Sequence, residues 1–309
     1  MDKLNTVKNQ FQQFLKDPEH QKRYQEIIEK TMNDKDIQTF IDLHSHQLTK
    51  EMIEKSYAKF NEFILERDAR KNGQEVKSPG MEPVLVINVG FVDVIYKPTE
   101  AYLQQKKERE LRSRVQAMNM PKNIQQARFS ELAVTAKREE VVGLALNFIE
   151  AHVSEPKKFH KGIYIVGPFG VGKTYLLGAI ANELAQNGLI TTLVHVPSLS
   201  SEMKNAIGEG GLSDKLDAIK KAPILILDDI GAESSSSWFR DEILGVILQY
   251  RMQQELPTFF SSNFTIAELE EHLRISQRGE DEGLKAKRII ERIKFLSTEV
   301  YLDGENRRN

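Results

Sequence analysis

The sequence predicts an α/β protein in which a parallel sheet is covered by helices on both faces and is preceded by a small α+β domain. From about residue 136 onward, short apolar runs rich in β-branched residues alternate with segments of helical spacing. This alternation is typical of a parallel sheet buried on both faces. Before that point, amphipathic helical patterns lead to two apolar runs around Gly90, which are typical of a hairpin.

Bulk composition favours a soluble protein of about two domains. The chain has 309 residues, a net charge of −2 and no cysteine. Disulfides, thiolate zinc sites and cysteine nucleophiles are therefore excluded, and DNA binding would need a local basic surface. The N-terminus lacks a basic-then-apolar leader, and no apolar stretch approaches the roughly 20 residues of a membrane span. We expect a cytoplasmic protein with no membrane partner.

The first domain, residues 1–105, is expected to contain three amphipathic helices and a hairpin. The helix faces are Leu4, Val7, Phe11, Phe14 and Leu15; Ile37, Phe40, Ile41 and His44, after a start signal at Asn33-Asp34; and Met52, Ile53, Tyr57, Phe60, Phe63 and Ile64. Apolar runs at 84–89 and 91–96 predict the hairpin. Residues 104–114 are highly charged and Pro121 follows, which favours a charged and partly helical linker over 106–135.

The second domain, residues 136–309, begins with a predicted helix at 141–151. Five apolar runs then predict strands, at 162–166, 189–196, 223–229, 257–263 and 299–302. An octapeptide after the first of these runs matches the phosphate-binding P-loop pattern and opens a helical segment. We therefore expect it to bind nucleotide phosphates through Gly167, Pro168, Phe169, Gly170, Val171, Gly172, Lys173 and Thr174. Tyr175, the next residue, is also expected to belong to the nucleotide-binding site.

Each part of the P-loop has a physical role. Backbone N–H groups of the loop and of the helix N-terminus attract anions, and the glycines allow close approach. Lys173 can reach the β- and γ-phosphates, and the Thr174 hydroxyl can ligate magnesium. The alternative is a glycine-rich turn with a chance lysine, which the strand-loop-helix context makes the weaker interpretation.

Polar residues end two later strands. Asp228 and Asp229 close the run at 223–229, and the carboxyl ends of parallel strands are where open α/β sheets present ligand groups. Asp228 fits the magnesium-holding role, and Asp229 fits the role of orienting and partly deprotonating an attacking water. Asn263, at the end of the next strand, is a candidate to face the γ-phosphate. The alternative is that these residues only cap strands at turns.

A basic helix lies near the C-terminus. Arg288 and Arg292 are four residues apart and so share one face. They form either a solvated basic face or a source of an arginine for a neighbouring subunit's γ-phosphate. Arg307 and Arg308 would more often be part of a frayed tail.

Taken together, these residues resemble an ATPase of the AAA+ class. More narrowly, the chain is similar to the bacterial replicative helicase loaders of the DnaC/DnaI group. The matching pieces are the P-loop with the Tyr175-Leu176-Leu177 that follows, Leu227-Asp228-Asp229-Ile230-Gly231-Ala232-Glu233, Trp238-Phe239-Arg240-Asp241-Glu242, Ser261-Ser262-Asn263, and the ending Asp303-Gly304-Glu305-Asn306-Arg307-Arg308.

The resemblance implies a five-stranded parallel sheet with little or no helical lid, and it implies ATP and Mg²⁺ as ligands. It makes Asp228 and Asp229 the Walker B pair, Asn263 a sensor 1 residue, Arg292 the arginine finger with Arg288 beside it, and Arg307 a sensor 2 arginine. It also implies partners: a hexameric DnaB-type helicase, single-stranded DNA contacted near a helix at about residues 198–207, other primosome proteins, and further copies of the chain.

The N-terminal domain departs from this group. Its members resemble a zinc-binding module there with mostly cysteine ligands, whereas this chain has no cysteine. His44 and His46 alone do not make a four-ligand zinc site, so zinc is not expected. Either the domain folds without metal, around the hairpin and helices, or it has diverged.

Three functions remain open from the sequence. The first is an ATP-dependent loader that delivers the replicative helicase to single-stranded DNA. The second is an ATP-dependent accessory of transposition, which shares the ATPase motifs. The third is a nucleotide-gated scaffold with negligible hydrolysis.

Overall fold

The computed structural model describes residues 18–118, 120–132, 135–206, 211–233, 236–275, 279 and 281–306. Two compact units divide the chain between residues 107 and 108, a position inside helix α6 (Glu100–Arg114). The apolar face predicted from Leu4 to Leu15 lies outside the described residues. Within the described part of the chain, no helix combines the length and the apolarity that a membrane crossing requires.

The N-terminal unit packs helices against a two-stranded hairpin. Its elements are α2 (Pro18–Met32), α3 (Lys35–Leu43), α4 (Lys50–Lys55), α5 (Tyr57–Lys71), β1 (Met81–Asn88) and β2 (Phe91–Pro98). The strands are antiparallel, with Asn88 opposite Phe91, which confirms the predicted hairpin. Its core comprises Ile37, Phe60, Leu85, Val92 and Val94, so the helix faces predicted around residues 37 and 60 do meet the hairpin.

An ion-pair cluster joins α3 to α5 in this unit. Asp34 caps α3 by accepting hydrogen bonds from the amides of Asp36 and Ile37. The Arg67 guanidinium donates to both carboxylate oxygens of Asp34 at 2.8 Å and also contacts Asp36 and Asp68. The hydrogen bonds from Arg67 hold the pKa of Asp34 below its ordinary value.

The second unit is built on a parallel sheet of six strands, in the order β3-β5-β6-β7-β4-β8. The strands are β3 (Val115–Met118), β4 (Gly162–Val166), β5 (Thr191–His195), β6 (Ile224–Asp228), β7 (Thr258–Ser262) and β8 (Ser297–Tyr301). The expectation of five strands was therefore wrong by one edge strand. β3 pairs with β5 and lies inside the segment 106–135 that we predicted to be a linker.

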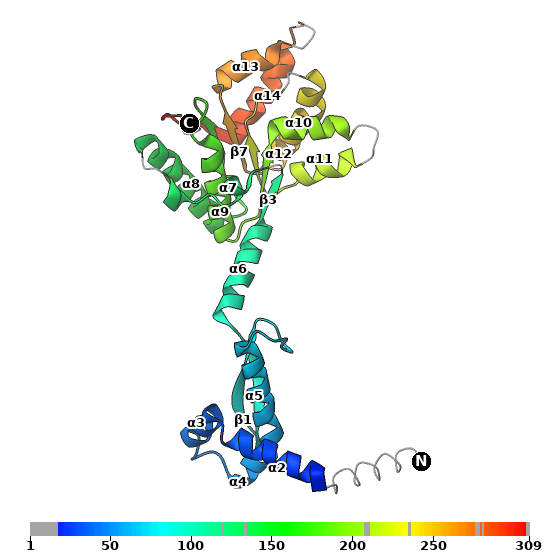
Figure 1. Ribbon diagram of the computed structural model, residues 1–309. Coiled ribbons are helices and arrows are strands. Elements are labelled where there is room, and N and C mark those ends of the chain that lie inside the picture. The colour runs from blue at the N-terminus through cyan, green and yellow to red at the C-terminus, as the bar shows by residue number, and fades with distance from the viewer. Residues whose placement is uncertain are drawn as a thin grey trace. The chain divides into compact units, whose positions relative to one another are not determined.

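Helices cover both faces of this sheet (Figure 1). They are α7 (Lys122–Gln125), a 3₁₀ turn η1 (Phe129–Glu131), α8 (Ala136–Ser154), α9 (Lys173–Gln186), α10 (Val196–Asn205), α11 (Leu212–Lys220), a π-helical segment η2 (Phe239–Leu244), α12 (Gly245–Gln253), α13 (Ile266–Arg274) and α14 (Gly283–Leu296).

The two faces form separate cores because successive side chains of a strand point to opposite sides. Ile163 and Ile165 belong to the cluster formed with α7, α8 and α9. Tyr164 and Val166, on the same strand, belong to the cluster formed with η2 and α10 to α14. All five residues of β4 are buried, as the continuous apolar run predicts for a strand covered on both faces.

Candidate nucleotide-binding site

The P-loop connects β4, which lies between β7 and β8, to the N-terminus of α9. Gly170 and Gly172 have φ values of 78° and 93°, a region that favours glycine, and Gly172 is the N-cap of α9. A helix N-terminus leaves backbone N–H groups without partners inside the helix, so this loop offers donors to an anion. Pro168 and Phe169 are exposed at the loop surface.

Lys173 is 7% exposed, and its ammonium is held by three oxygen atoms. It donates to the carbonyl oxygens of Gly167 at 2.7 Å and Pro168 at 2.9 Å, and to Oδ1 of Asn263 at 2.7 Å. The P-loop backbone and the residue that follows β7 therefore both contact this cation.

Thr174 and Asp228 meet beside this lysine. The Thr174 hydroxyl donates to Oδ1 of Asp228 at 3.1 Å, and the Ser261 hydroxyl donates to the same oxygen at 2.5 Å. Burial raises the pKa of Asp228, while the hydrogen bonds from Ser261 and Thr174 act in the opposite direction. A buried carboxylate next to a hydroxyl is an oxygen donor set that suits magnesium. These residues fit the ion that the P-loop pattern implies.

Asp229 lies next to this pair in an unusual backbone conformation. Its φ is 62°, a left-handed value that aspartate tolerates better than most residues. Its amide donates to the Ser261 hydroxyl at 3.0 Å, and Nδ2 of Asn263 donates to its Oδ1 at 3.1 Å. Asn263 thus links Lys173 to Asp229, which brings together the residues that the sequence predicted from separate strands.

His195 was missed by the sequence prediction. It ends β5, next to the strand that ends in Asp228, and its Nε2 lies 4.0 Å from Oδ2 of Asp229. Its Nδ1 lies 2.8 Å from the Ser198 hydroxyl. A histidine at the carboxyl end of a strand beside an acidic strand end was the signal that could have marked it.

These groups line a pocket of about 920 Å³, and several other lining residues come from the predicted linker. They are Met120, Pro121, Asn123, Ile124, Glu131 and Leu132. Tyr175 joins them by donating from its hydroxyl to Glu131 at 2.5 Å. Pro121 and the apolar positions after it were the available sequence signal, but the charged segment before them favoured a linker.

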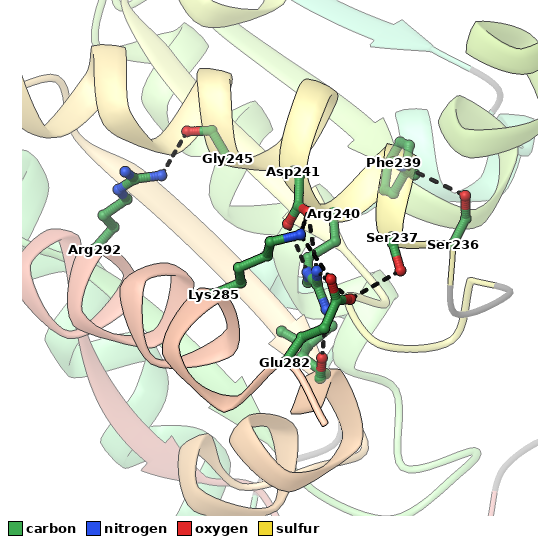
Figure 2. Close-up of polar contacts among 10 residues, drawn as sticks. Ser236, Ser237, Phe239, Arg240, Asp241, Gly245, Glu282, Lys285 and Arg292 are labelled. Atoms are coloured by element: carbon green, nitrogen blue, oxygen red, sulfur yellow. Dashed lines mark hydrogen bonds and ion pairs between the residues drawn. The ribbon is translucent and has the colours of Figure 1, made fainter. Parts of the chain in front are cut away.

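The predicted arginines lie apart from this pocket. Arg288 is exposed on α14, and neither it nor Arg292 lines the pocket among the described residues. Arg292 donates to the carbonyl oxygen of Gly245 at 2.9 Å (Figure 2). Burial lowers the pKa of Arg292, and the charge of Arg288 adds to this effect. Arg307 lies outside the described residues.

An ion-pair network fixes the beginning of the helix that carries both arginines (Figure 2). Arg240 is 5% exposed and contacts Asp241 and Glu282, each at 2.7 Å. Lys285 contacts Asp241 at 3.0 Å and Glu282 at 2.6 Å. Hydrogen bonds from Lys285 and Arg240 lower the pKa of Glu282 to about 2. η2 is thereby tied to the first turn of α14.

Each of the two parts of the chain matches a known protein family. The family described as primosomal protein DnaI N-terminus matches residues 4–96, and the IstB-like ATP binding protein family matches residues 88–309. The replicative helicase loader DnaI of Bacillus subtilis is 40% identical over 94% of this chain and 95% of its own length. The chain belongs to the DnaI family of replicative helicase loaders.

Other similarities agree with this DnaI-family assignment. A crystal structure of DnaI covers 62% of this chain and 98% of its own length, with 45% identity and a TM-score of 0.55. An insertion sequence IS5376 putative ATP-binding protein from Geobacillus stearothermophilus is 24% identical over 59% of this chain and 69% of its own length. The second unit is thus an ATP-binding domain of the AAA+ P-loop type, as the sequence predicted.

Proposed function

We propose that this chain binds and hydrolyses ATP to load a hexameric replicative DNA helicase onto single-stranded DNA. The observation that carries the ATPase part is the continuous set of contacts from Lys173 through Asn263 to Asp229, beside Thr174 and Asp228. The loader part is supported by a relative that aligns with nearly the whole chain and is named a replicative helicase loader.

In this proposal, each side chain acts on one part of the nucleotide. The P-loop N–H groups and Lys173 bind the phosphates. Thr174 and Asp228 hold magnesium, which, when bound, neutralises phosphate charge. Asp229 accepts a proton from the attacking water, and Asn263 orients Asp229 through the 3.1 Å hydrogen bond.

The position of Arg288 and Arg292 favours action on a second copy. Both lie on α14, outside the pocket of their own subunit as far as the described residues show. We propose that α14 presents Arg292, with Arg288 beside it, to the γ-phosphate of a neighbouring subunit. Arg307 stays a proposed sensor of bound nucleotide.

We assign the helicase contact to the N-terminal domain, residues 1–105, and ATP hydrolysis to residues 136–309. The segment 106–135 would serve as more than a linker, because β3 extends the sheet and six residues between 120 and 132 line the pocket. We further propose cytoplasmic localisation, contact with single-stranded DNA near α10, and contact with other primosome proteins.

Zinc plays no part in this proposal. Among the described residues, no group of three or more histidine, cysteine, aspartate or glutamate side chains is placed to hold a metal ion. The contacts among Arg67, Asp34, Asp36 and Asp68 provide a metal-free link between α3 and α5 instead.

A transposition accessory is the second candidate, favoured by the IstB-like match over residues 88–309. The DnaI-type match over residues 4–96 supports the loader instead. A non-hydrolysing scaffold would show nucleotide binding without phosphate release.

Co-precipitation of the full chain with the replicative helicase tests the proposal. We expect binding by the wild type and by Lys173→Ala, because the lysine lies in the ATP site rather than in the N-terminal domain. Absence of binding by the wild type, with and without ATP, would contradict the loader function.

A further inference from the structure

Arg138 is a buried cation beside the P-loop, and the reaction proposed above gives it no role. It lies in the first turn of α8, is 3% exposed, and borders the nucleotide pocket. Its Nη2 donates to the carbonyl oxygen of Val171 at 2.8 Å. Burying a guanidinium to this extent costs free energy unless its contacts compensate for the lost hydration. The hydrogen bond to the P-loop is one such contact.

That hydrogen bond constrains a peptide group that faces the phosphate site. In a planar trans peptide, the C=O of one residue and the N–H of the next point in opposite directions. Holding the Val171 carbonyl therefore fixes the direction of the Gly172 N–H. Gly172 lines the pocket and caps α9, so this N–H belongs to the donors that an anion would meet.

The P-loop and the C-terminal tail both lie close to this guanidinium. A Cβ built on Gly172 or on Gly304 would lie 3.8 Å from Nη2 of Arg138. The Leu302 amide donates to the carbonyl of Val166 at 2.7 Å, which holds the start of the tail against the P-loop strand. Three segments thus meet around Arg138: the first turn of α8, the P-loop and the tail.

We propose that Arg138 is a positioning residue for phosphate binding, which fixes the Val171–Gly172 peptide so that the Gly172 N–H faces the bound phosphates. Its charge also polarises that peptide and strengthens the N–H as a donor. The proposal rests on the nucleotide binding proposed above and adds a residue of α8 to the P-loop. The affinity for a phosphate-bearing ligand depends on Arg138, whereas helicase binding does not.

The test measures the affinity of the full chain for a fluorescent ADP, and for inorganic pyrophosphate as a competitor. Arg138→Gln is expected to weaken both affinities by at least about tenfold, because the charge-assisted hydrogen bond to the Val171 carbonyl, which holds the Gly172 N–H toward the phosphates, is lost. Arg138→Lys keeps the charge and should restore part of the affinity, while remaining at least about threefold weaker than wild type. Arg138→Lys also tests the proposal by itself if Arg138→Gln does not fold.

Arg251 supplies a matched control for simple destabilisation. It is 0% exposed and also donates to main-chain carbonyls, those of Ala222 and Pro257, each at 2.7 Å. Arg251→Gln should lower the melting temperature but leave both affinities unchanged well below that temperature. ADP and pyrophosphate affinities of both Arg138 variants within about twofold of wild type would overturn the proposal. Failure of the wild type to bind ADP would instead overturn the proposed function, and this inference with it.

Discussion

Asn263→Ala is expected to slow ATP hydrolysis far more than it weakens ATP binding. The side chain makes two contacts with different consequences. It accepts from Lys173 at 2.7 Å, and it donates to Asp229 at 3.1 Å. Its removal therefore separates a binding contact from an orienting contact in a single variant.

The expected magnitudes follow from what each partner retains. Lys173 keeps the carbonyl oxygens of Gly167 and Pro168, so we expect ATP affinity to fall by about threefold or less. The Asp229 carboxylate loses the side-chain amide of Asn263 that orients it. The backbone N–H of Asp229 still donates to the Ser261 hydroxyl. Because a well-placed general base contributes about 10²–10⁴-fold, we expect kcat to fall by about 10²-fold, or about 2.7 kcal/mol in the barrier.

The assay is single-turnover phosphate release at saturating ATP, with affinity measured separately by a fluorescent ATP. Ser262→Ala is the control, since this neighbouring hydroxyl donates to the Ile230 carbonyl at 2.7 Å. If Asn263 acts through Asp229, the double variant Asn263→Ala/Asp229→Asn should lose no more activity than Asp229→Asn alone. Full additivity of the two losses, or a normal rate for Asn263→Ala, would refute the reasoning.

Three further outcomes are expected. Arg292→Ala should keep ATP affinity and lose hydrolysis. Mixing it with Lys173→Ala should restore some phosphate release, since the Lys173→Ala subunit supplies Arg292 to the intact ATP site of the Arg292→Ala subunit; no restoration would argue against the neighbouring-subunit role. Lys173→Ala alone should lower ATP affinity by at least about tenfold, measured by fluorescent ATP, because a cation at the phosphates is removed; near-normal affinity would contradict the P-loop assignment. Asp34→Asn should destabilise α3 at neutral pH by about 1 kcal/mol, read by hydrogen exchange against wild type at the same pH. The folded pKa of Asp34 is lowered, so its stabilising contribution is present above its unfolded pKa and is lost on acidification. The stability difference between the two proteins should therefore narrow progressively as the pH falls below about 5; a constant difference would argue against the Arg67 contact.

Residues whose role depends on local pattern could be predicted from the sequence. The P-loop glycines, Lys173 and Thr174 lie within eight consecutive positions, and a strand before and a helix after them complete the signal. Asp228 and Asn263 could be added because one ends a buried strand and the other directly follows one, and parallel strands align their carboxyl ends. The hydrogen bonds that join these residues follow from that alignment.

Residues whose role depends on distant packing could not be predicted in the same way. β3 has only four residues and becomes a strand by pairing with β5, about seventy-five positions later in the chain. Residues between 120 and 132 reach the pocket because α7 packs against α9, a contact that no local periodicity encodes. Arg138 lies in an ordinary helix start, and only the folded chain brings its guanidinium to the Val171 carbonyl.

The most direct test of the central claim is helicase loading on circular single-stranded DNA. The replicative helicase would be incubated with the circle, ATP and either the wild-type chain or Lys173→Ala, and the helicase retained on DNA would be measured after gel filtration. We predict that the wild type increases the retained helicase and that Lys173→Ala does not, although both bind the helicase. Retention that is unchanged by the wild-type chain, or equal with both chains, would contradict ATP-dependent loading.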